Sequence, residues 1–267
     1  MKVGGRLVPT MMLLVWLLMA GIALAAPPAE VSRPLVYLEH VDYPPYYYKR
    51  GEVDHGTAVD ALNAILTPLG YSYRIEVMPI ERLYTEAGSG YGDLTMVHTY
   101  PGLTLEDYPD FLLVCPTPMS RIPIRYYTYQ LELTELSRKA LSKLRIGLFR
   151  YASFQRGLTQ REQMGNISRF NDVRYMFRAL LADRIDLAIN GPYSMRVMAE
   201  QHGSYFPYEL NIDLGNIESF VAVTQRAEKE LGIYQALCQQ AANWSIERDF
   251  KHALGKHMKS YLKSLSE

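Results

Sequence analysis

The sequence predicts an α/β protein made of two similar units that follow one another along the chain. Segments with strand-like and helix-like patterns alternate, which is typical of open, mostly parallel sheets. The same alternation begins again near residue 124. If the first 25 of the 267 residues are removed, 242 remain, which is enough for one large domain or two small lobes.

The first 25 residues have the layout of a secretory signal peptide. Lys2 and Arg6 give a basic start, an apolar run extends from Met11 to Leu24, and Ala23-Leu24-Ala25 forms a small-x-small cleavage site. The run is short for a membrane span, which needs roughly 20 apolar residues. Cleavage after Ala25 is therefore favoured over an uncleaved anchor, and we expect a secreted protein.

The charge balance argues against nucleic acid or an anionic membrane as the partner. The chain carries 28 basic and 28 acidic residues, and removal of Lys2 and Arg6 leaves 26 against 28, a net charge of −2. Tyrosine is frequent, with 21 residues against 8 phenylalanines. A tyrosine ring has an apolar face and one hydroxyl, which suits wet clefts as well as cores.

The first unit shows clear periodicities. Apolar residues recur at helical spacing from Thr57 to Leu69, where Gly70 stands at the position of a C-terminal cap. Alternation from Tyr71 to Met78 indicates a strand. The expected elements are strands at 36–38, 71–78, 93–98 and 111–115 and helices at 57–69 and 80–87.

The second unit repeats this plan. Ser153 is a candidate helix cap, Asn171 is another, and Pro192 stands at the first turn of a further helix. The expected strands lie at 124–129, 144–149, 185–190 and 219–223. The expected helices lie at 133–141, at 153–163, after Asn171, after Gly191 and in two closing segments that carry the apolar residues of 231–241 and 246–262.

A cluster of tyrosines and prolines follows the first strand. Pro44 and Pro45 restrict the backbone, which holds Tyr43, Tyr46 and Tyr47 near the carboxyl end of that strand. Ligands of open α/β sheets bind at this end, and aromatic rings there form a stacking wall for a small molecule. The alternative is that these rings cap the edge of a core.

Further candidate ligand-binding residues lie at strand ends and helix starts, except for Arg82, whose role is implied only by the family resemblance given below. They are Arg82, His98, Thr99, Tyr100, Thr117, Arg150, Ser153, Asn190 and Tyr193. Arg150 and Ser153 lead into an expected helix start, where free N–H groups and the helix dipole favour an anionic group. For Arg82 the alternative is a surface ion pair with Glu81 or Glu86.

Catalysis, cofactor binding and metal binding find little support in the sequence. It contains no nucleophile elbow, no P-loop and no zinc-type histidine pair, because His252 and His257 are five residues apart on one expected helix. We therefore expect no enzyme, no cofactor and no metal. Cys115 lies in an apolar strand and Cys238 on a helix face; two buried free thiols are favoured over one disulfide.

In order and spacing, these segments resemble periplasmic solute-binding protein family 3, the small receptors related to the polar amino-acid receptors of ABC transporters. The matching segments are Tyr43-Pro44-Pro45-Tyr46, Gly56-Thr57-x-x-Asp60-x-Leu62, Arg82, Gly92-Asp93-Leu94, Tyr108-Pro109-Asp110-Phe111, Cys115-Pro116-Thr117-Pro118, 144–150 and 184–189. The resemblance implies a two-lobed clamshell in which each lobe is an open mixed sheet flanked by helices. Lobe 1 would comprise 30–118 and 218–267, and lobe 2 would comprise 119–217.

The resemblance also implies a function in the periplasm. A monomer would close around a small polar solute and present it to a membrane partner, either the permease of an ABC importer or a sensor. An enzyme on the same scaffold, such as a dehydratase or a lytic transglycosylase, is one alternative. A ligand-sensing envelope adaptor is another.

Two charged contacts of amino-acid receptors are missing. The family clamps the ligand carboxylate with the Arg of a Thr-x-x-Arg motif, but here the stretch is His98-Thr99-Tyr100-Pro101-Gly102-Leu103. The family's amine-pairing Asp is also absent, because the corresponding stretch is Asn190-Gly191-Pro192. An ordinary α-amino acid is therefore a poor candidate ligand. Arg121, Arg125 and Arg150 are the candidate replacements for the missing Arg.

Overall fold

The computed structural model describes residues 33–135, 138–149 and 166–265 of the chain. Residues 33–267 belong to one compact unit. The expected signal peptide, Arg150, Ser153 and the helix expected at 153–163 lie outside the described residues. No helix within these ranges is long and apolar enough to cross a membrane.

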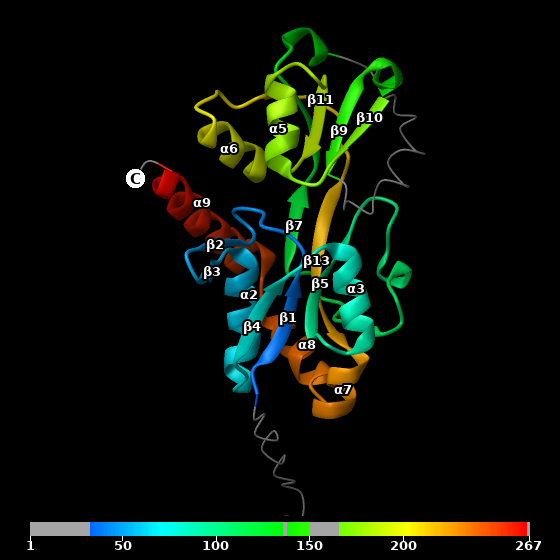
Figure 1. Cartoon of the computed structure of the whole chain (residues 1–267), viewed down its shortest axis with the longest axis vertical. Coiled ribbons are helices and arrows are strands. Elements are labelled where there is room, and N and C mark those ends of the chain that lie inside the picture. Colours follow the sequence, from blue (N-terminus) through cyan, green and yellow to red (C-terminus); the bar gives the residue numbers. More distant parts are fainter. Residues whose placement is uncertain (1–32, 136–137, 150–165, 266–267) are drawn as a thin grey trace, which may run out of the picture. The chain divides into compact units, whose positions relative to one another are not determined.

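The larger of two sheets has six strands in the order β4-β1-β5-β13-β6, with β7 pairing with the first half of β13. These strands are β1 (Leu35–Glu39), β4 (Tyr73–Val77), β5 (Leu94–Thr99), β6 (Leu112–Val114), β7 (Ser120–Pro123) and β13 (Asn216–Thr224). Strand β1 is parallel to β4 and β5, whereas β13 is antiparallel to β5, β6 and β7. The helices around it are α2 (Thr57–Leu66), α3 (Ile80–Ser89), α7 (Gln225–Leu231) and α8 (Tyr234–Asn243) (Figure 1). We call this sheet and these helices the first lobe.

The second sheet has five strands in the order β10-β9-β11-β8-β12. They are β8 (Arg125–Thr128), β9 (Arg145–Phe149), β10 (Asn166–Phe170), β11 (Leu187–Asn190) and β12 (Tyr208–Glu209). Strand β9 is parallel to β10 and β11, whereas β8 is antiparallel to β11 and β12. With helices α5 (Val173–Leu181) and α6 (Pro192–Gln201), this sheet forms the second lobe. Both sheets are mixed, as the sequence predicted.

The remaining elements are short, apart from the last helix. They are a hairpin of β2 (Tyr48–Arg50) and β3 (Val53–His55), the 3₁₀ turns Thr67–Leu69, Leu105–Asp107, Leu131–Leu133 and Arg138–Lys143, a π-helical turn at Ile246–Phe250, and α9 (Lys251–Leu265). Ala253 and Leu254 of α9 belong to a core of the first lobe, while Met258, Tyr261 and Leu262 also pack against a core of the second. Helix α9 therefore contacts both lobes.

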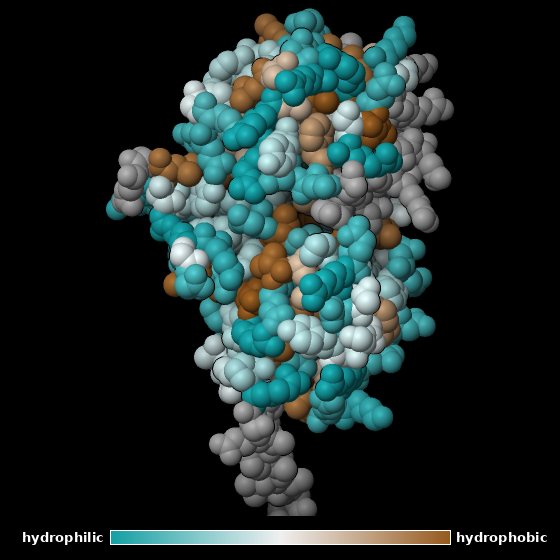
Figure 2. All heavy atoms as spheres, in the orientation of Figure 1, coloured by the Kyte–Doolittle hydropathy of each residue, from teal (hydrophilic) through white to brown (hydrophobic). Residues whose placement is uncertain are grey.

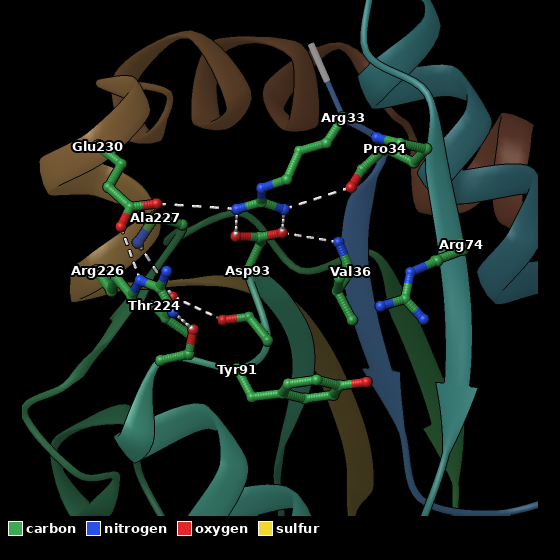
Figure 3. Close-up of polar contacts among 12 residues, drawn as sticks. Arg33, Pro34, Val36, Arg74, Tyr91, Asp93, Thr224, Arg226, Ala227 and Glu230 are labelled. Atoms are coloured by element: carbon green, nitrogen blue, oxygen red, sulfur yellow. Dashed lines mark hydrogen bonds and ion pairs between the residues drawn. The ribbon is translucent and has the colours of Figure 1, made fainter. Parts of the chain in front are cut away.

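The amino end of β1 is fixed by a buried carboxylate. Asp93 is 2% exposed, and its two oxygens accept hydrogen bonds from Nη1 and Nη2 of Arg33 at 2.6 and 2.8 Å (Figure 3). The backbone N–H of Val36 also donates to Asp93 at 2.8 Å. All five residues of β1 are buried, so this ion pair lies at the beginning of a central strand.

Three features of the local structure differ from what the sequence predicted. The segment expected as a helix at 133–141 instead contains 3₁₀ turns at Leu131–Leu133 and Arg138–Lys143. The Thr134 hydroxyl donates to the carbonyl of Leu131 at 2.7 Å, a local bond that competes with helix continuation. Strand β10 was not predicted, because its residues are mostly polar and exposed at the sheet edge. Helix α5 is capped by Asp172, one residue after the expected cap.

The prediction of free thiols is also wrong, because Cys115 and Cys238 form a disulfide. Cys115 follows β6 and Cys238 lies on α8. Their Cα atoms are 5.2 Å apart, within the range that a disulfide bridges. The packing of α8 into a core of the first lobe, with strands of the larger sheet, brings together two residues separated by 123 positions.

Candidate functional site

A cavity of about 110 Å³ has walls from both lobes. The first lobe contributes the end of β1, the loop after it, α2, β5, β7 and β13, and the second lobe contributes the ends of β9 and β11. Apolar side chains gather at mid-height of the face shown in Figure 2, between more hydrophilic surfaces. A site of this kind, at strand ends and between two lobes, is where α/β receptors bind small molecules.

Six of the predicted ligand-binding residues line this cavity: Tyr43, Tyr46, Tyr47, His98, Tyr100 and Asn190. They come from the loop after β1, from the end of β5 and from the end of β11. The structure thus brings together residues up to 147 positions apart, such as Tyr43 and Asn190. Their contact with a ligand remains a prediction.

Four other predicted residues do not belong to the cavity wall. Arg82 is exposed and its Nε donates to Glu86 at 3.2 Å on the surface of α3, which is the alternative that the sequence left open. Tyr193 packs against a core of the first lobe, and Thr99 and Thr117 are half-buried elsewhere. Arg150 and Ser153 lie outside the described residues.

Aromatic rings form one wall of the cavity. The Tyr43 ring stacks on Tyr46, with centroids 5.4 Å apart, and on Phe149 at the end of β9, with centroids 6.0 Å apart. The Tyr43 hydroxyl donates to Oδ1 of Asn190. Burial raises the pKa of Tyr43 to about 12, so the hydroxyl stays a neutral donor. Tyr43 therefore connects the loop after β1 with two strands of the second lobe.

The backbone of the tyrosine loop is held by local contacts. The N–H of Tyr46 donates to the carbonyl of Tyr43 at 2.9 Å, and the N–H of Tyr43 donates to that of Tyr47 at 2.7 Å. Gly56, with φ of 122°, lies against this turn, and a Cβ atom there would collide with the carbonyl of Tyr46. A glycine at this position therefore allows the loop to pack on the start of α2.

A polar cluster forms another wall and begins at Glu39, the last residue of β1. Glu39 is buried; its Oε1 accepts from the N–H of His40 at 2.8 Å and lies 3.0 Å from His40 Nδ1. Oε2 accepts from the Tyr37 hydroxyl at 3.2 Å. Burial works to raise the pKa of Glu39, but the hydrogen bonds and charge of His40 outweigh it and leave this pKa below its usual value. Glu39 is thus a carboxylate at neutral pH.

His98 is the neutral member of this cluster. Burial, with a smaller contribution from His40, lowers the pKa of His98 to about 4. Its Nδ1 lies 2.9 Å from Oγ of Ser219, which accepts from the Ser120 hydroxyl at 2.7 Å. The rings of His40 and His98 meet edge to face at 5.6 Å. The cluster therefore offers neutral hydrogen-bonding groups beside one carboxylate.

The arginines near the site have other partners. Arg121 forms an ion pair with Glu218 at 2.7 Å, and Arg125 pairs with Glu209 and Asp213 at 3.1 and 2.9 Å. Neither lines the cavity, and none of the described residues that line it is Arg or Lys. Two of the three candidate replacements for a carboxylate-clamping Arg are thus engaged elsewhere.

The described residues of the cavity wall form no recognisable catalytic or metal centre. Ser219 beside His98 has the residue types of a nucleophile and base, but a histidine with a pKa of about 4 is a weak base at neutral pH. Within the described ranges, no group of three or more His, Cys, Asp or Glu residues could hold a metal ion.

Several residues of the cavity wall were not predicted from the sequence, chiefly Glu39, Phe149, Ser120 and Ser219. A signal for Glu39 was present, because an acidic residue directly followed an apolar strand and preceded the tyrosine loop. Phe149 ended a predicted strand and could have been included for the same reason. Ser120 and Ser219 approach each other through the pairing of β7 with β13, which the sequence did not reveal.

No family model matches the sequence, and no match was found among the curated proteins. The structure, by contrast, matches many solved structures. An amino-acid ABC transporter substrate-binding protein from Streptococcus pneumoniae, bound to L-arginine, is 17% identical with a TM-score of 0.68, over 86% of this chain and 96% of that one. A periplasmic binding protein of Salmonella typhimurium with high arginine specificity is 12% identical with a TM-score of 0.66, over 84% and 99%.

A third similar structure is a histidine kinase sensor domain described as similar to periplasmic binding proteins. It is 16% identical with a TM-score of 0.68, over 84% of this chain and 96% of that one. At these identities the comparison establishes the fold. The resemblance inferred from the sequence is confirmed at that level: this chain has the two-lobed fold of the periplasmic solute-binding proteins.

Proposed function

We propose that the protein is a periplasmic receptor that closes around a small solute and presents it to a membrane partner. The observation that carries this proposal is the cavity, whose walls come from both lobes. A ligand that contacts both lobes binds the closed arrangement more tightly than an open one, and so shifts the population toward closure. The closed form then presents a surface that a partner distinguishes from the open form.

The proposal is supported by the fold and by the character of the site. The similar structures bind small molecules or belong to sensor proteins. The cavity combines stacked rings with a few polar groups, which is typical of small-molecule sites. The residues expected to contact the solute are Tyr43, Tyr46, Tyr47, His98, Tyr100 and Asn190, joined by Glu39 and Phe149.

Thermal unfolding of the mature protein against a panel of metabolites tests this function. The panel contains amino acids, amines, organic acids, sugars and peptides. A ligand at 100 times its Kd adds about 2.7 kcal/mol to the free energy of unfolding. Small-angle scattering with and without the hit then measures closure. A folded protein that shows neither a shift nor a change in dimension with any ligand contradicts the receptor function.

The nature of the partner is a separate proposal. An ABC importer is the first candidate, because one of the similar proteins is a substrate-binding protein of such a transporter. A membrane sensor is the second, because another is a kinase sensor domain. Uptake of the labelled ligand by cells with and without the gene separates them: loss of uptake supports the importer, and unchanged uptake with a lost transcriptional response supports the sensor.

A further inference from the structure

The cavity wall contains a buried carboxylate, Glu39, whose partners are a histidine and a tyrosine hydroxyl and not an Arg or Lys side chain. Glu39 is 7% exposed, and its oxygens meet the His40 backbone and imidazole on one side and the Tyr37 hydroxyl on the other. A carboxylate has about four acceptor sites, so these contacts leave capacity for a further donor. A buried charge is costly when no fixed opposite charge accompanies it, and a cationic donor in the cavity reduces that cost.

Several rings that line the same cavity as Glu39 are suited to the same charge. Tyr43, Tyr46 and Phe149 stack along one wall, and the rings of His40 and His98 meet beside Glu39. The faces of tyrosine and phenylalanine rings attract cations, by about 0.5–2 kcal/mol according to their exposure to water. His98 adds no charge of its own at neutral pH, because its pKa is lowered to about 4. Apart from His40, the described lining therefore has no cationic side chain beside Glu39, and it has several rings that attract one.

The two described arginines that are candidates for binding a carboxylate are engaged outside the cavity, and the third, Arg150, lies outside the described residues. Arg121 and Arg125 form ion pairs with acidic residues of the surface. Asn190, which does line the cavity, accepts with its Oδ1 from the Tyr43 hydroxyl and the Gly191 N–H, and its Nδ2 donates to the sulfur of Met195 at 3.6 Å. A negative group placed here would face the Glu39 carboxylate without a described cation in the wall.

We infer that the cavity takes a small organic cation that lacks a carboxylate, with its ammonium or guanidinium group beside Glu39 and its apolar or aromatic body among Tyr43, Tyr46 and Phe149. This inference rests on the proposed receptor function and names the chemical class of its ligand. It separates this protein from the similar structures that carry L-arginine, whose ligand has both a cationic group and a carboxylate.

Isothermal titration of the mature protein with matched ligands tests the inference. Tyramine and tyrosine differ only in the carboxylate, as do agmatine and arginine, while 3-(4-hydroxyphenyl)propionate keeps the acid and lacks the amine. We expect at least one amine to bind about tenfold or more tightly than its amino acid, since a charge-assisted hydrogen bond is retained and a repulsion is removed. The acid is expected not to bind measurably.

The variant Glu39→Gln assigns the effect to its carboxylate. The amide keeps the shape and an acceptor oxygen but removes the charge, so amine affinity should fall about tenfold or more. Asp93→Asn is the matched control, because it makes the same chemical change in the same sheet at a carboxylate outside the cavity wall. This control should keep the preference for amines.

The outcomes separate the two proposals. If an amino acid or the acid binds as tightly as the amines, the receptor function stands and the ligand class is overturned. If Glu39→Gln keeps the full preference for amines, the role of Glu39 is overturned. Should this variant fail to fold, the ratio of amine to amino-acid affinity in the unaltered protein still decides the ligand class. A flat response to every ligand counts against the receptor function as well.

Discussion

Two buried carboxylates, Asp93 and Glu39, lie at opposite ends of the larger sheet and have different partners. Asp93 precedes β5 and is held by two guanidinium nitrogens of Arg33 and one backbone N–H (Figure 3). Glu39 ends β1 in the cavity wall and is held by His40 and a tyrosine hydroxyl. The first has a permanent counter-ion, and the second does not.

The difference shows how one sheet serves two purposes. At the amino end of β1 a complete ion pair fixes the chain, so that end contributes stability. At the carboxyl end the sheet retains a carboxylate whose partners are a histidine and a tyrosine hydroxyl instead of an arginine, so that end can gain interaction energy from a ligand.

Substitution of Asp93 by Ala should have the largest effect on stability. The change removes three hydrogen bonds and leaves the Val36 N–H without its partner inside the sheet. Because Arg33 is partly exposed and regains water, we expect a loss of about 3 kcal/mol in the free energy of unfolding. Urea denaturation measures it. A loss below about 1 kcal/mol would show that Asp93 contributes no more to the free energy of unfolding than Glu39 is expected to contribute.

Acidification should lower the free energy of unfolding through His98, which lies in the cavity wall. Its pKa is lowered from the usual 6.5 to about 4 in the folded state, so unfolding binds a proton between these two pH values. The free energy of unfolding therefore falls as the pH drops from about 6.5 to about 4, by about 2 kcal/mol once partial exposure is considered.

The variant His98→Gln tests this assignment. It should lack that part of the pH dependence while the remaining acid sensitivity of the chain is kept. Urea titrations at several pH values measure the difference between variant and original protein. Parallel stability curves for the two proteins across this pH range would contradict the prediction.

Substitution of Glu39 by Gln should change stability less than the Asp93 substitution does. Gln keeps one acceptor oxygen for the His40 N–H, and its amide N–H can donate to the Tyr37 hydroxyl oxygen, so we expect a loss of about 1 kcal/mol at neutral pH. The pKa of Glu39 lies below its usual 4.5 in the folded state, so the contribution of its charge is present above pH 4.5 and is lost as the pH falls further. Denaturation curves at pH 7 and pH 3 check both statements, and a larger loss at pH 3 would refute them.

Substitution of Arg82 by Ala should have the smallest effect. The Arg82–Glu86 pair lies on the surface of α3, and exposed pairs at this helical spacing contribute about 0.3–0.5 kcal/mol. We expect unfolding to change within that range, with ligand affinity unaltered. A marked loss of affinity would return Arg82 to the binding site, where the sequence had placed it.

The sequence predicted the parts of the fold that depend on local periodicity. The apolar run of β1 and the helical spacing of α2 mark central elements, because a buried element must be apolar toward the core. The tyrosine loop was also found, because Pro44 and Pro45 restrict the backbone and hold aromatic rings near the carboxyl end of a strand. Strand β10 escaped because an edge strand needs no apolar face.

The parts that depend on contacts distant in sequence were not predictable. The disulfide joins residues 123 positions apart, and nothing in the neighbourhood of Cys115 or Cys238 reveals the other. Glu39 was overlooked because a charged residue at a strand end usually points into water. Its burial depends on the neighbouring strands and on the other residues of the cavity wall, which are distant in sequence.

The placement of α9 has a consequence for any movement between the lobes. Its first half packs into a core of the first lobe, while Met258, Tyr261 and Leu262 pack against a core of the second. Separation of the lobes must therefore expose those three side chains to water or carry the end of the helix along. A spin label at the exposed Leu265, paired with one on the first lobe, would report which of the two occurs as a change in distance.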